Sequence, residues 1–382
     1  MSSTSHDPAR IPAESFLPGE YIAEELEARG WTQTDLAEIL GRPLRLVNEL
    51  IKGKRSITPE TARGLAQAFG TSAELWMNLE SAYQLSRVAS PDDAVQRRSR
   101  LYDKAPIKEM VRRGWLASSS SIEAMEQQVI AFYGLKSLDA TPQLAVAARA
   151  KMAGPRWTSA QIAWFHRARQ VAKAVHVAPY SAKRLNEIAQ QLQALLLSPE
   201  DIRNAARVLA DGGIRLVVVE DLPGTKIDGA CLWLDKSSPV VALSLRYDRI
   251  DSVWFTLWHE LGHVSKGPAD TSLDVDLIGG RGADDARPEN EQAADRYACE
   301  HLVPTAQLDD WILRTEPLYA RIKIEAFAAR IKVHPGIVLG QLKHRKIIDW
   351  PVLAGLHAKV RSFVLSSTLC DGYGHMVPVP LN

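Results

Sequence analysis

The sequence predicts a mainly α-helical protein with one small antiparallel β-sheet, an α+β fold, and three observations lead to this expectation. Apolar residues three and four positions apart, typical of amphipathic helices, recur through 18–85 and through much of 94–210. Short β-branched or apolar runs follow one another closely at 214–219, 229–234 and 240–245, with turn residues between them. The 382 residues are also more than one hydrophobic core usually holds, which predicts several domains.

The predicted domains follow the changes of pattern along the chain. Residues 1–90 are expected to form an all-helical unit, and 91–210 a helical middle region, with helices at 123–132, 143–150, 159–175 and 182–197. The sheet and further helices are expected within 211–365, followed by a loose tail at 366–382. Two of the later helices, 251–266 and 291–302, are separated by a glycine-rich, acidic stretch at 270–290 that reads as a long loop.

Composition excludes several classes of protein. The chain is 46% hydrophobic and 24% charged, with 46 basic and 45 acidic side chains, which excludes collagen and extended disorder. Its three cysteines lie far apart with no CxxC pair, so neither a disulfide framework nor a cysteine zinc cage is indicated. The polar start lacks the apolar core of a secretion signal, and no apolar run reaches the roughly 18 residues of a membrane span. A cytoplasmic protein without a membrane partner is expected.

Residues 32–55 have the layout of a helix-turn-helix. A capped helix over 33–40 ends at Gly41, whose left-handed conformation turns the chain into a second helix opened by Pro43. Ala37 is small enough to let the two helices cross closely. Four apolar residues are expected to form the shared core: Leu36, Leu40, Val47 and Ile51.

The second helix of this pair carries local positive charge. Residues 42–55 contain five basic residues and one acidic residue, Glu49, although residues 1–90 contain nine basic and twelve acidic ones. Arg45 and Asn48 are the candidate base readers, because Arg suits guanine and Asn suits adenine in the major groove. Arg42 on the same outer face is a further candidate DNA contact. The candidates for contact with the DNA backbone are Gln33, Lys52, Lys54 and Arg55.

A single module of this kind binds weakly, so a homodimer on two-fold operator DNA is expected. A small helical bundle without a role in DNA binding is the competing interpretation, because a net-acidic domain is a poor nonspecific DNA binder.

A family resemblance covers 18–85, the run PGEYIAEELEARGWTQTDLAEILGRPLRLVNELIKGKRSITPETARGLAQAFGTSAELWMNLESAYQL. This run resembles the HigA antitoxin branch of the phage-repressor helix-turn-helix family, most distinctively at SITPET, 56–61, and at the end near Trp76. The resemblance implies operator binding, autoregulation and a toxin partner. The chain departs from the family at Pro43 and Leu44, where many recognition helices begin with a small polar residue.

A second candidate site begins at the motif HELGH, residues 259–263. On a helix, His259 and His263 lie one turn apart on one face, the spacing with which two imidazoles bind one tetrahedral Zn²⁺. Glu260 lies beside them, where it can accept a proton from water at the metal. The motif alone is a weak signal, because only three of its positions are fixed.

A third candidate ligand strengthens the metal hypothesis. Glu291 opens the next predicted helix, 28 positions after His263, and completes a set of two histidines and one carboxylate that leaves a fourth position open. Asp295, one turn later, is suited to accept the free ring N–H of a ligand histidine. In the competing interpretation, Glu291 and Asp295 belong to a solvated helix face and the histidines are ordinary polar residues with satisfied hydrogen bonds.

The segments around this motif resemble the ImmA/IrrE family of metallopeptidases, over roughly 210–350. The likeness is carried by IDGACLW at 227–233, VALSLRY at 241–247, WFTLWHELGH at 254–263, residues 291–304, and HPGIVLGQL at 334–342. It implies a zincin-like domain in which His259, His263 and Glu291 bind zinc and Glu260 is the catalytic base. Ala293 stands where a second Glu is common and Asp295 where Asn is common, which affects the surroundings of the ligands.

Together the two sites predict a DNA-binding transcriptional regulator with a Zn²⁺-dependent endopeptidase domain. Its substrate is expected to be a repressor-like regulatory protein or this chain itself. A second hypothesis is a HigA-type antitoxin or autorepressor whose metal domain only senses or binds a partner such as a toxin. A third is a peptidase whose helical N-terminal unit binds protein and no DNA.

Overall fold

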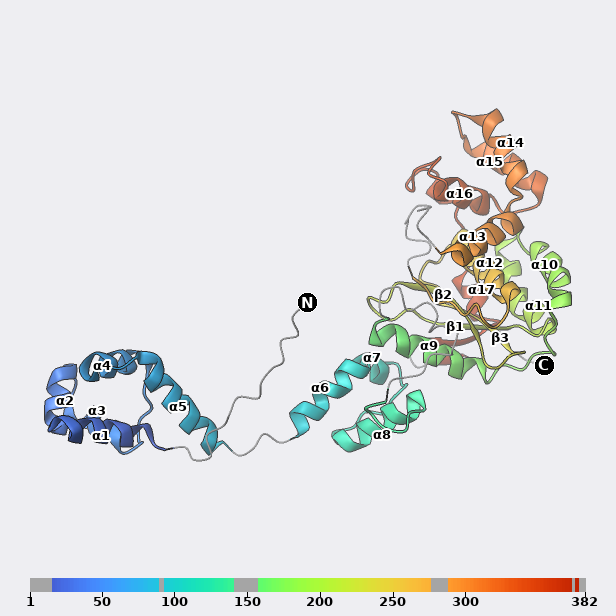
Figure 1. Ribbon diagram of the computed structural model, residues 1–382. Coiled ribbons are helices and arrows are strands. Elements are labelled where there is room, and N and C mark those ends of the chain that lie inside the picture. Colours follow the sequence, from blue (N-terminus) through green and yellow to red (C-terminus); the bar gives the residue numbers. More distant parts are fainter. Residues whose placement is uncertain (1–15, 89–92, 141–156, 276–287, 373–374, 378–382) are drawn as a thin grey trace. The chain divides into compact units, whose positions relative to one another are not determined.

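The computed structural model describes residues 16–88, 93–140, 157–275, 288–372 and 375–377. The chain divides into two compact units, Met1–Val95 and Gln96–Asn382 (Figure 1). The helix expected at 143–150, most of the loop expected at 270–290 and the last five residues lie outside the described ranges. None of the helices described is both long enough and apolar enough to cross a membrane.

The N-terminal unit is all-helical, as predicted. Its helices are α1 (Pro18–Arg29), α2 (Gln33–Leu40), α3 (Leu44–Ile51), α4 (Pro59–Phe69) and α5 (Ala73–Arg87). Gly41 ends α2 in the left-handed conformation, φ 60°, which the predicted turn between the two helices requires. Thr32 caps α2 by accepting a hydrogen bond from the Asp35 N–H, and the Asp35 carboxylate accepts one from the Thr32 N–H in return.

The core of this unit differs in part from the predicted set. Leu36 and Val47 are fully buried, as expected, whereas Leu40 and Ile51 are only half-buried at its margin. Leu50 points into the core instead, because α1 packs against α3 so closely that a side chain at Gly19 would meet the Ile51 backbone. The other buried members are Ile22, Leu26, Ala37, Ile57, Ala62, Leu65, Phe69 and Trp76.

The second unit combines many helices with a six-stranded sheet. Its helices are α6 (Ala94–Lys104), α7 (Ile107–Arg112), α8 (Ile122–Tyr133), α9 (Ser159–Ala172), α10 (Leu185–Gln193), α11 (Ala205–Asp211), α12 (Ile250–Lys266), α13 (Glu289–Leu302), α14 (Thr305–Thr315), α15 (Arg321–Ile331), α16 (Pro335–His344) and α17 (Arg361–Leu365). Its strands are β1 (Arg215–Val219), β2 (Ile227–Trp233), β3 (Pro239–Leu243), β4 (Asp274–Val275), β5 (Leu369–Gly372) and β6 (His375–Val377). The α+β class and the predominance of helix are therefore confirmed.

The sheet is mixed, which corrects the expectation of an antiparallel one. The strand order is β4-β2-β3-β1-β5-β6. β2 is antiparallel to both β3 and β4, and β5 is antiparallel to β6, but β1 is parallel to β3 and to β5. The segment between β1 and β3 contains β2, so β1 meets β3 only after the chain has reversed twice, and the two strands then run in the same direction.

Both faces of the sheet are covered, and side chains alternate between two cores. Leu216 and Val218 of β1 pack with α10–α17, whereas Val217 and Val219 pack with α6–α9 (Figure 1). The helical segment predicted as a separate middle region, 91–210, therefore supplies layers to both faces: α9 lies against one face, and α10 and α11 contribute to the core on the other.

The predicted loose tail is wrong at its start. β5 pairs with β1 over 369–371, where Leu369, Cys370 and Asp371 are buried. Arg167 of α9 forms an ion pair with the Asp371 carboxylate, which ties this strand to the helix layer beneath it. The sequence SSTLCDG at 366–372 has no alternation of apolar and polar residues, and only its distant partner β1 makes it a strand.

Candidate metal centre and nucleic-acid interface

Helix α12 is the central helix of the second unit. Every residue from Ile250 to Val264 is buried, because the helix lies between the sheet, α13 and α16. Its apolar residues face both sides, as in a helix enclosed by protein. Three polar side chains, His259, Glu260 and His263, are fully buried in this setting, which requires that each has a partner.

The two histidines and Glu291 of α13 converge on one point. The Nε2 atoms of His259 and His263 lie 3.1 Å apart, and each lies 3.4 Å from Oε2 of Glu291. The helical spacing of the two histidines and the packing of α13 along α12 produce this arrangement. The structure thus brings together the three side chains that the sequence proposed as ligands.

The far nitrogen of each imidazole faces a carboxylate. His259 Nδ1 lies 2.9 Å from Asp295 Oδ1, and His263 Nδ1 lies 2.8 Å from Asp270 Oδ2. Because an ionised carboxylate only accepts hydrogen bonds, each ring donates from Nδ1, and in the neutral ring the Nε2 lone pair is directed at the shared point. The contact of Asp295 is the one proposed from the sequence, whereas that of Asp270 was not foreseen.

Asp274 is the second side chain that sequence reasoning missed. Its Oδ2 lies 3.6 Å from His259 Nε2, and one ligand atom from each of His259, His263, Asp274 and Glu291 lies within 4.8 Å of the others. Asp274 belongs to β4, within the stretch expected to be a loop, and it reaches the histidines because β4 pairs with β2. The only signal in the sequence was the acidic character of that stretch.

Glu260 lies against the sheet. Its Oε2 accepts a hydrogen bond from the Ser272 hydroxyl at 3.1 Å, and its Oε1 has no hydrogen-bond partner among the described residues. A Cβ at Gly229 of β2 would lie 2.5 Å from that Oε1. Glycine at this position therefore makes room for the carboxylate.

The electrostatics of the site suit a divalent cation. Burial is the main cause that raises the pKa of Glu260 well above its usual range, and the negative charge of the Asp274 carboxylate is the second. Burial opposes the charging of His263, but the Asp270 and Glu291 carboxylates outweigh it and raise its pKa to about 9. The carboxylates around the two rings thus favour positive charge at this point. The two imidazole nitrogens and the carboxylate oxygens of Glu291 and Asp274 form a group of donors that could hold a metal ion.

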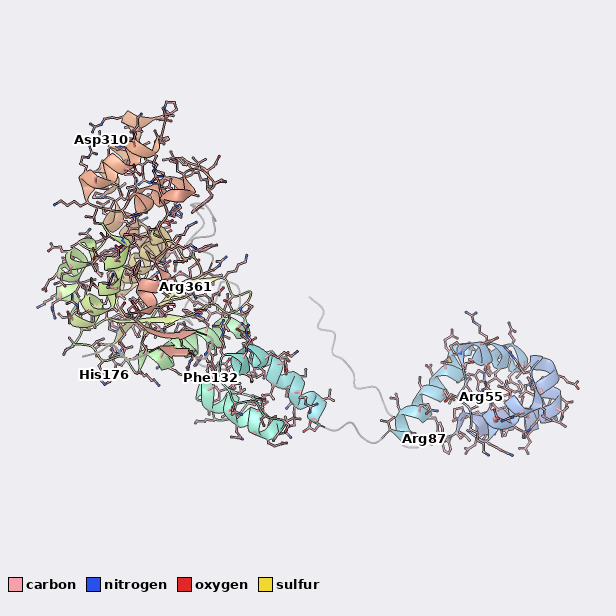
Figure 2. All side chains as sticks on the ribbon, turned by 180° about the vertical axis from the view of Figure 1, so that it is seen from behind. Arg55, Arg87, Phe132, His176, Asp310 and Arg361 are labelled. Carbon is pink, nitrogen blue, oxygen red and sulfur yellow. The ribbon has the colours of Figure 1, made fainter. Side chains whose placement is uncertain are left out.

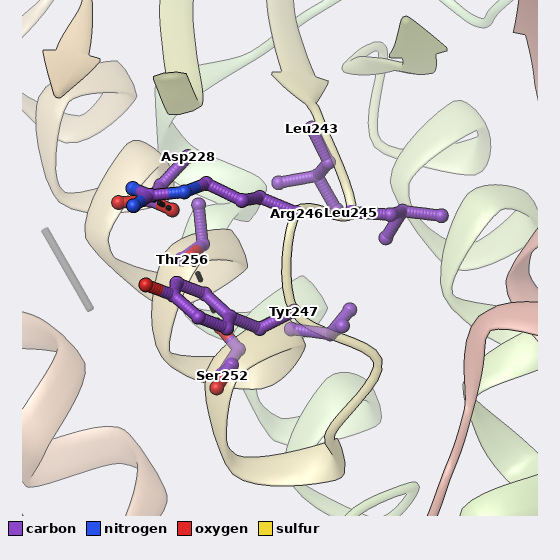
Figure 3. Close-up of a pocket in the computed structure, with 8 residues that line it drawn as sticks. Asp228, Leu243, Leu245, Arg246, Tyr247, Ser252 and Thr256 are labelled. Atoms are coloured by element: carbon purple, nitrogen blue, oxygen red, sulfur yellow. Dashed lines mark hydrogen bonds and ion pairs between the residues drawn. The ribbon is translucent and has the colours of Figure 1, made fainter. Parts of the chain in front are cut away.

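A pocket lies one helical turn before Glu260, where the loop after β3 passes α12 (Figure 3). Thr256 contributes to its wall and, like Glu260, lies against Gly229. Arg246 crosses the pocket toward the buried Asp228, with 3.6 Å between guanidinium and carboxylate (Figure 3). The remaining lining residues are Leu243, Leu245, Tyr247, Ser252 and Val253.

The candidate DNA contacts lie on and after α3 in the N-terminal unit. Arg42, Arg45, Lys52, Lys54 and Arg55 are exposed, whereas Gln33 and Asn48 are half-buried. The side chain of Arg45 is 88% exposed, and Arg55 projects from the same unit (Figure 2). Asn48 Nδ2 lies 3.4 Å from the Leu44 carbonyl, a contact weak enough to be exchanged for a base edge.

Acidic side chains neutralise part of this surface. Glu49 accepts a hydrogen bond from Arg45 Nε at 2.8 Å and lies 3.5 Å from Arg55 Nη1. Arg42 forms an ion pair with Glu60. Three of the five basic candidates are therefore engaged with carboxylates, and the sequence alone did not indicate that Glu49 serves two arginines.

Comparison with known proteins concerns this N-terminal unit. The helix-turn-helix family model HTH_3 matches residues 22–76. The chain is 38% identical over 69 residues to virulence-associated protein I of Dichelobacter nodosus, which covers 18% of this chain and 64% of that protein. A solved structure of an addiction module antidote protein of a HigA family from Coxiella burnetii shares 41% identity over 19% of this chain and 79% of its own, with a TM-score of 0.18.

These matches cover only part of this chain and different shares of the relatives' own length. The chain spans just under two thirds of virulence-associated protein I, but 81% of the uncharacterized HTH-type transcriptional regulator YddM of Escherichia coli (strain K12). To YddM it is 31% identical over 76 residues, a fifth of this chain. Through its N-terminal unit, the chain belongs to the helix-turn-helix family.

Proposed function

We propose that this protein is a DNA-binding transcriptional regulator whose second unit is a zinc-dependent endopeptidase. The observation that carries the enzymatic half is the convergence of two imidazole Nε2 atoms and Glu291 Oε2 beside the buried Glu260. The resemblance of 210–350 to the ImmA/IrrE metallopeptidases supports the same assignment.

His259, His263 and Glu291 would hold the metal, and Asp295 and Asp270 would orient the two rings. When bound, Zn²⁺ supplies a Lewis acid that polarises a peptide carbonyl and acidifies water. Glu260 then accepts a proton at a carboxylate oxygen and returns it to the leaving amine.

Metal analysis tests the enzymatic half. Purified protein should hold one zinc ion per chain, and His259→Ala and Glu291→Ala should abolish stoichiometric binding. Glu260→Gln should retain zinc but lose cleavage of the candidate substrate, so it separates the metal site from the chemistry. A wild-type chain that binds no zinc would refute the proposal.

The candidate substrates are a repressor-like regulatory protein and the chain itself. Self-cleavage is tested by incubating zinc-loaded wild type beside Glu260→Gln and sequencing any fragments. Fragments that arise at one site in wild type alone support it, and identical stability of the two proteins contradicts it.

For the DNA-binding half, we propose operator recognition in the major groove by α3, with Arg45 and Asn48 reading bases and with the chain acting as a homodimer in the cytoplasm. A DNA-shift assay on the region upstream of the gene tests this. Arg45→Ala combined with Asn48→Ala should abolish sequence preference, whereas Lys54→Ala should weaken binding to all sequences alike.

A second candidate function is favoured by the closure of the metal site. Four donors and complete burial of His259, Glu260 and His263 are typical of structural metal sites, in which no position is left for water. In that case the chain would be a HigA-type antitoxin or autorepressor whose metal domain senses or binds a partner such as a toxin. Glu260→Gln would then leave repression and partner binding unchanged.

A further inference from the structure

A short segment closes the metal site by pairing with the sheet. The segment Thr271–Val275, which includes β4, runs antiparallel along β2, with Asp274 opposite Gly229 and Val275 opposite Ile227. The Ser272 N–H donates to the Cys231 carbonyl at 2.9 Å, and the Cys231 N–H donates to the Ser272 hydroxyl oxygen at 3.3 Å. β4 is the edge strand beside β2 and has only two residues. Among the described elements, this short strand alone pairs with that edge of β2.

The same segment touches both reactive groups of the site. The Ser272 hydroxyl donates to Glu260, and the Asp274 carboxylate lies beside the Nε2 of His259. Thr271, Ser272 and Asp274 are buried, and the side chains beneath them, His259 and Glu260, have no exposed surface. The segment is therefore part of the enclosure that leaves His259 and Glu260 without exposed surface.

We propose that Thr271–Val275 occupies the place of the substrate, an inference that rests on the proposed function. The substrate is then an extended peptide, which pairs with β2 after this segment is released. An extended peptide that adds to a sheet edge forms the same backbone hydrogen bonds that the segment now forms. Its carbonyl oxygen is an oxygen donor like the Asp274 carboxylate, and it would lie where that carboxylate approaches His259. Asp274 is then an exchangeable fourth donor, distinct from the three that remain.

The test uses the full-length chain with Ser272→Ala and Asp274→Ala combined, and hydrogen–deuterium exchange as the readout. Removing the two hydrogen bonds of the Ser272 hydroxyl and the Asp274 contact with His259 should speed exchange of the amides at 229–231 by about tenfold, because each lost contact changes the opening equilibrium severalfold. Asp310→Ala, an exposed aspartate of α14 (Figure 2), is the control and should leave this exchange unchanged.

Zinc content and peptide binding complete the test. The double variant should still bind one zinc per chain, and a blocked synthetic peptide of residues 269–275 should bind it at least about tenfold more tightly than wild type and restore slow exchange. Unchanged exchange, or loss of zinc from the variant, would overturn the inference. If the double variant does not fold, Ser272→Ala alone should speed exchange of the Cys231 amide. Exchange measured without zinc does not depend on the enzymatic proposal, whose own failure would appear as a wild type that binds no metal.

Discussion

The carboxylates behind the histidines offer the sharpest test of the metal site. In Asp295→Asn, His259 keeps a neighbour of the same shape, but the neighbour is neutral and no longer a strong acceptor for the Nδ1 proton held at 2.9 Å. Loss of such a partner typically weakens metal binding by about 10–100-fold, or about 1.4–2.7 kcal/mol. Asp270→Asn should act in the same way on His263, where the contact is 2.8 Å.

Competition with a chromogenic chelator gives the zinc affinity directly. Thermal unfolding with and without zinc gives the loss of zinc-binding free energy independently, because metal binding to the folded state adds to stability. The zinc-free protein should lose much less stability, since Asp295 is one of several carboxylates crowded around the two rings. Asp310→Asn serves as the control. Zinc affinity of Asp295→Asn within twofold of wild type would show that the charge of this carboxylate does not contribute to metal binding through His259.

Three further predictions concern separate parts of the molecule. Glu49→Gln should free Arg45 for the bases and Arg55 for phosphate, and steepen the dependence of log DNA affinity on log salt by about 1, measured by titration at several KCl concentrations; an unchanged slope contradicts this. Burial lowers the pKa of His166 from 6.5 to about 4, so the unfolded chain binds more protons between these values and stability falls by up to about 3 kcal/mol as pH drops through that window. In His166→Phe, the free energy of unfolding by urea should fall less between pH 7 and pH 4.5 than in wild type. An equal fall in both proteins would count against this prediction. Gly229→Ala should cost about 1–3 kcal/mol by overpacking and displace Glu260 while zinc remains bound, a result checked by unfolding and metal analysis.

Local patterns in the sequence were sufficient for the helix-turn-helix and for α12. Gly41, the apolar spacing and the charge on α3 all act within a few residues, and so does the one-turn separation of His259 and His263. Glu291 could be proposed because a third ligand on the next helix is a short extrapolation. These features depend on helix periodicity, which a single sequence reports directly.

Features that depend on distant pairing could not be predicted in this way. Asp270 and Asp274 reach the histidines only because the segment after α12 turns back onto β2, and nothing in their spacing indicates it. The direction of β1 and the inclusion of β5 have the same cause, since β1 and β5 are joined by about 150 residues of chain. The choice between neighbouring hydroxyls as a helix cap is also hard to predict: Thr32 and Ser72 cap α2 and α5, although Thr34 and Thr71 nearby offer the same chemistry.

The closed site also determines how tightly a substrate must bind. If the segment Thr271–Val275 keeps 99% of molecules closed, a substrate has to prefer the open state by about 10⁴-fold, or about 5.5 kcal/mol, to open 99% of them. A short peptide forms only the few hydrogen bonds to β2 that the segment gives up, so pairing alone cannot supply this preference. Additional contacts are required, and the pocket with Arg246 beside α12 is one described feature within reach of a peptide on β2. Cleavage should therefore fall steeply when the substrate is shortened to the residues that pair with β2, whereas an open site would tolerate the truncation.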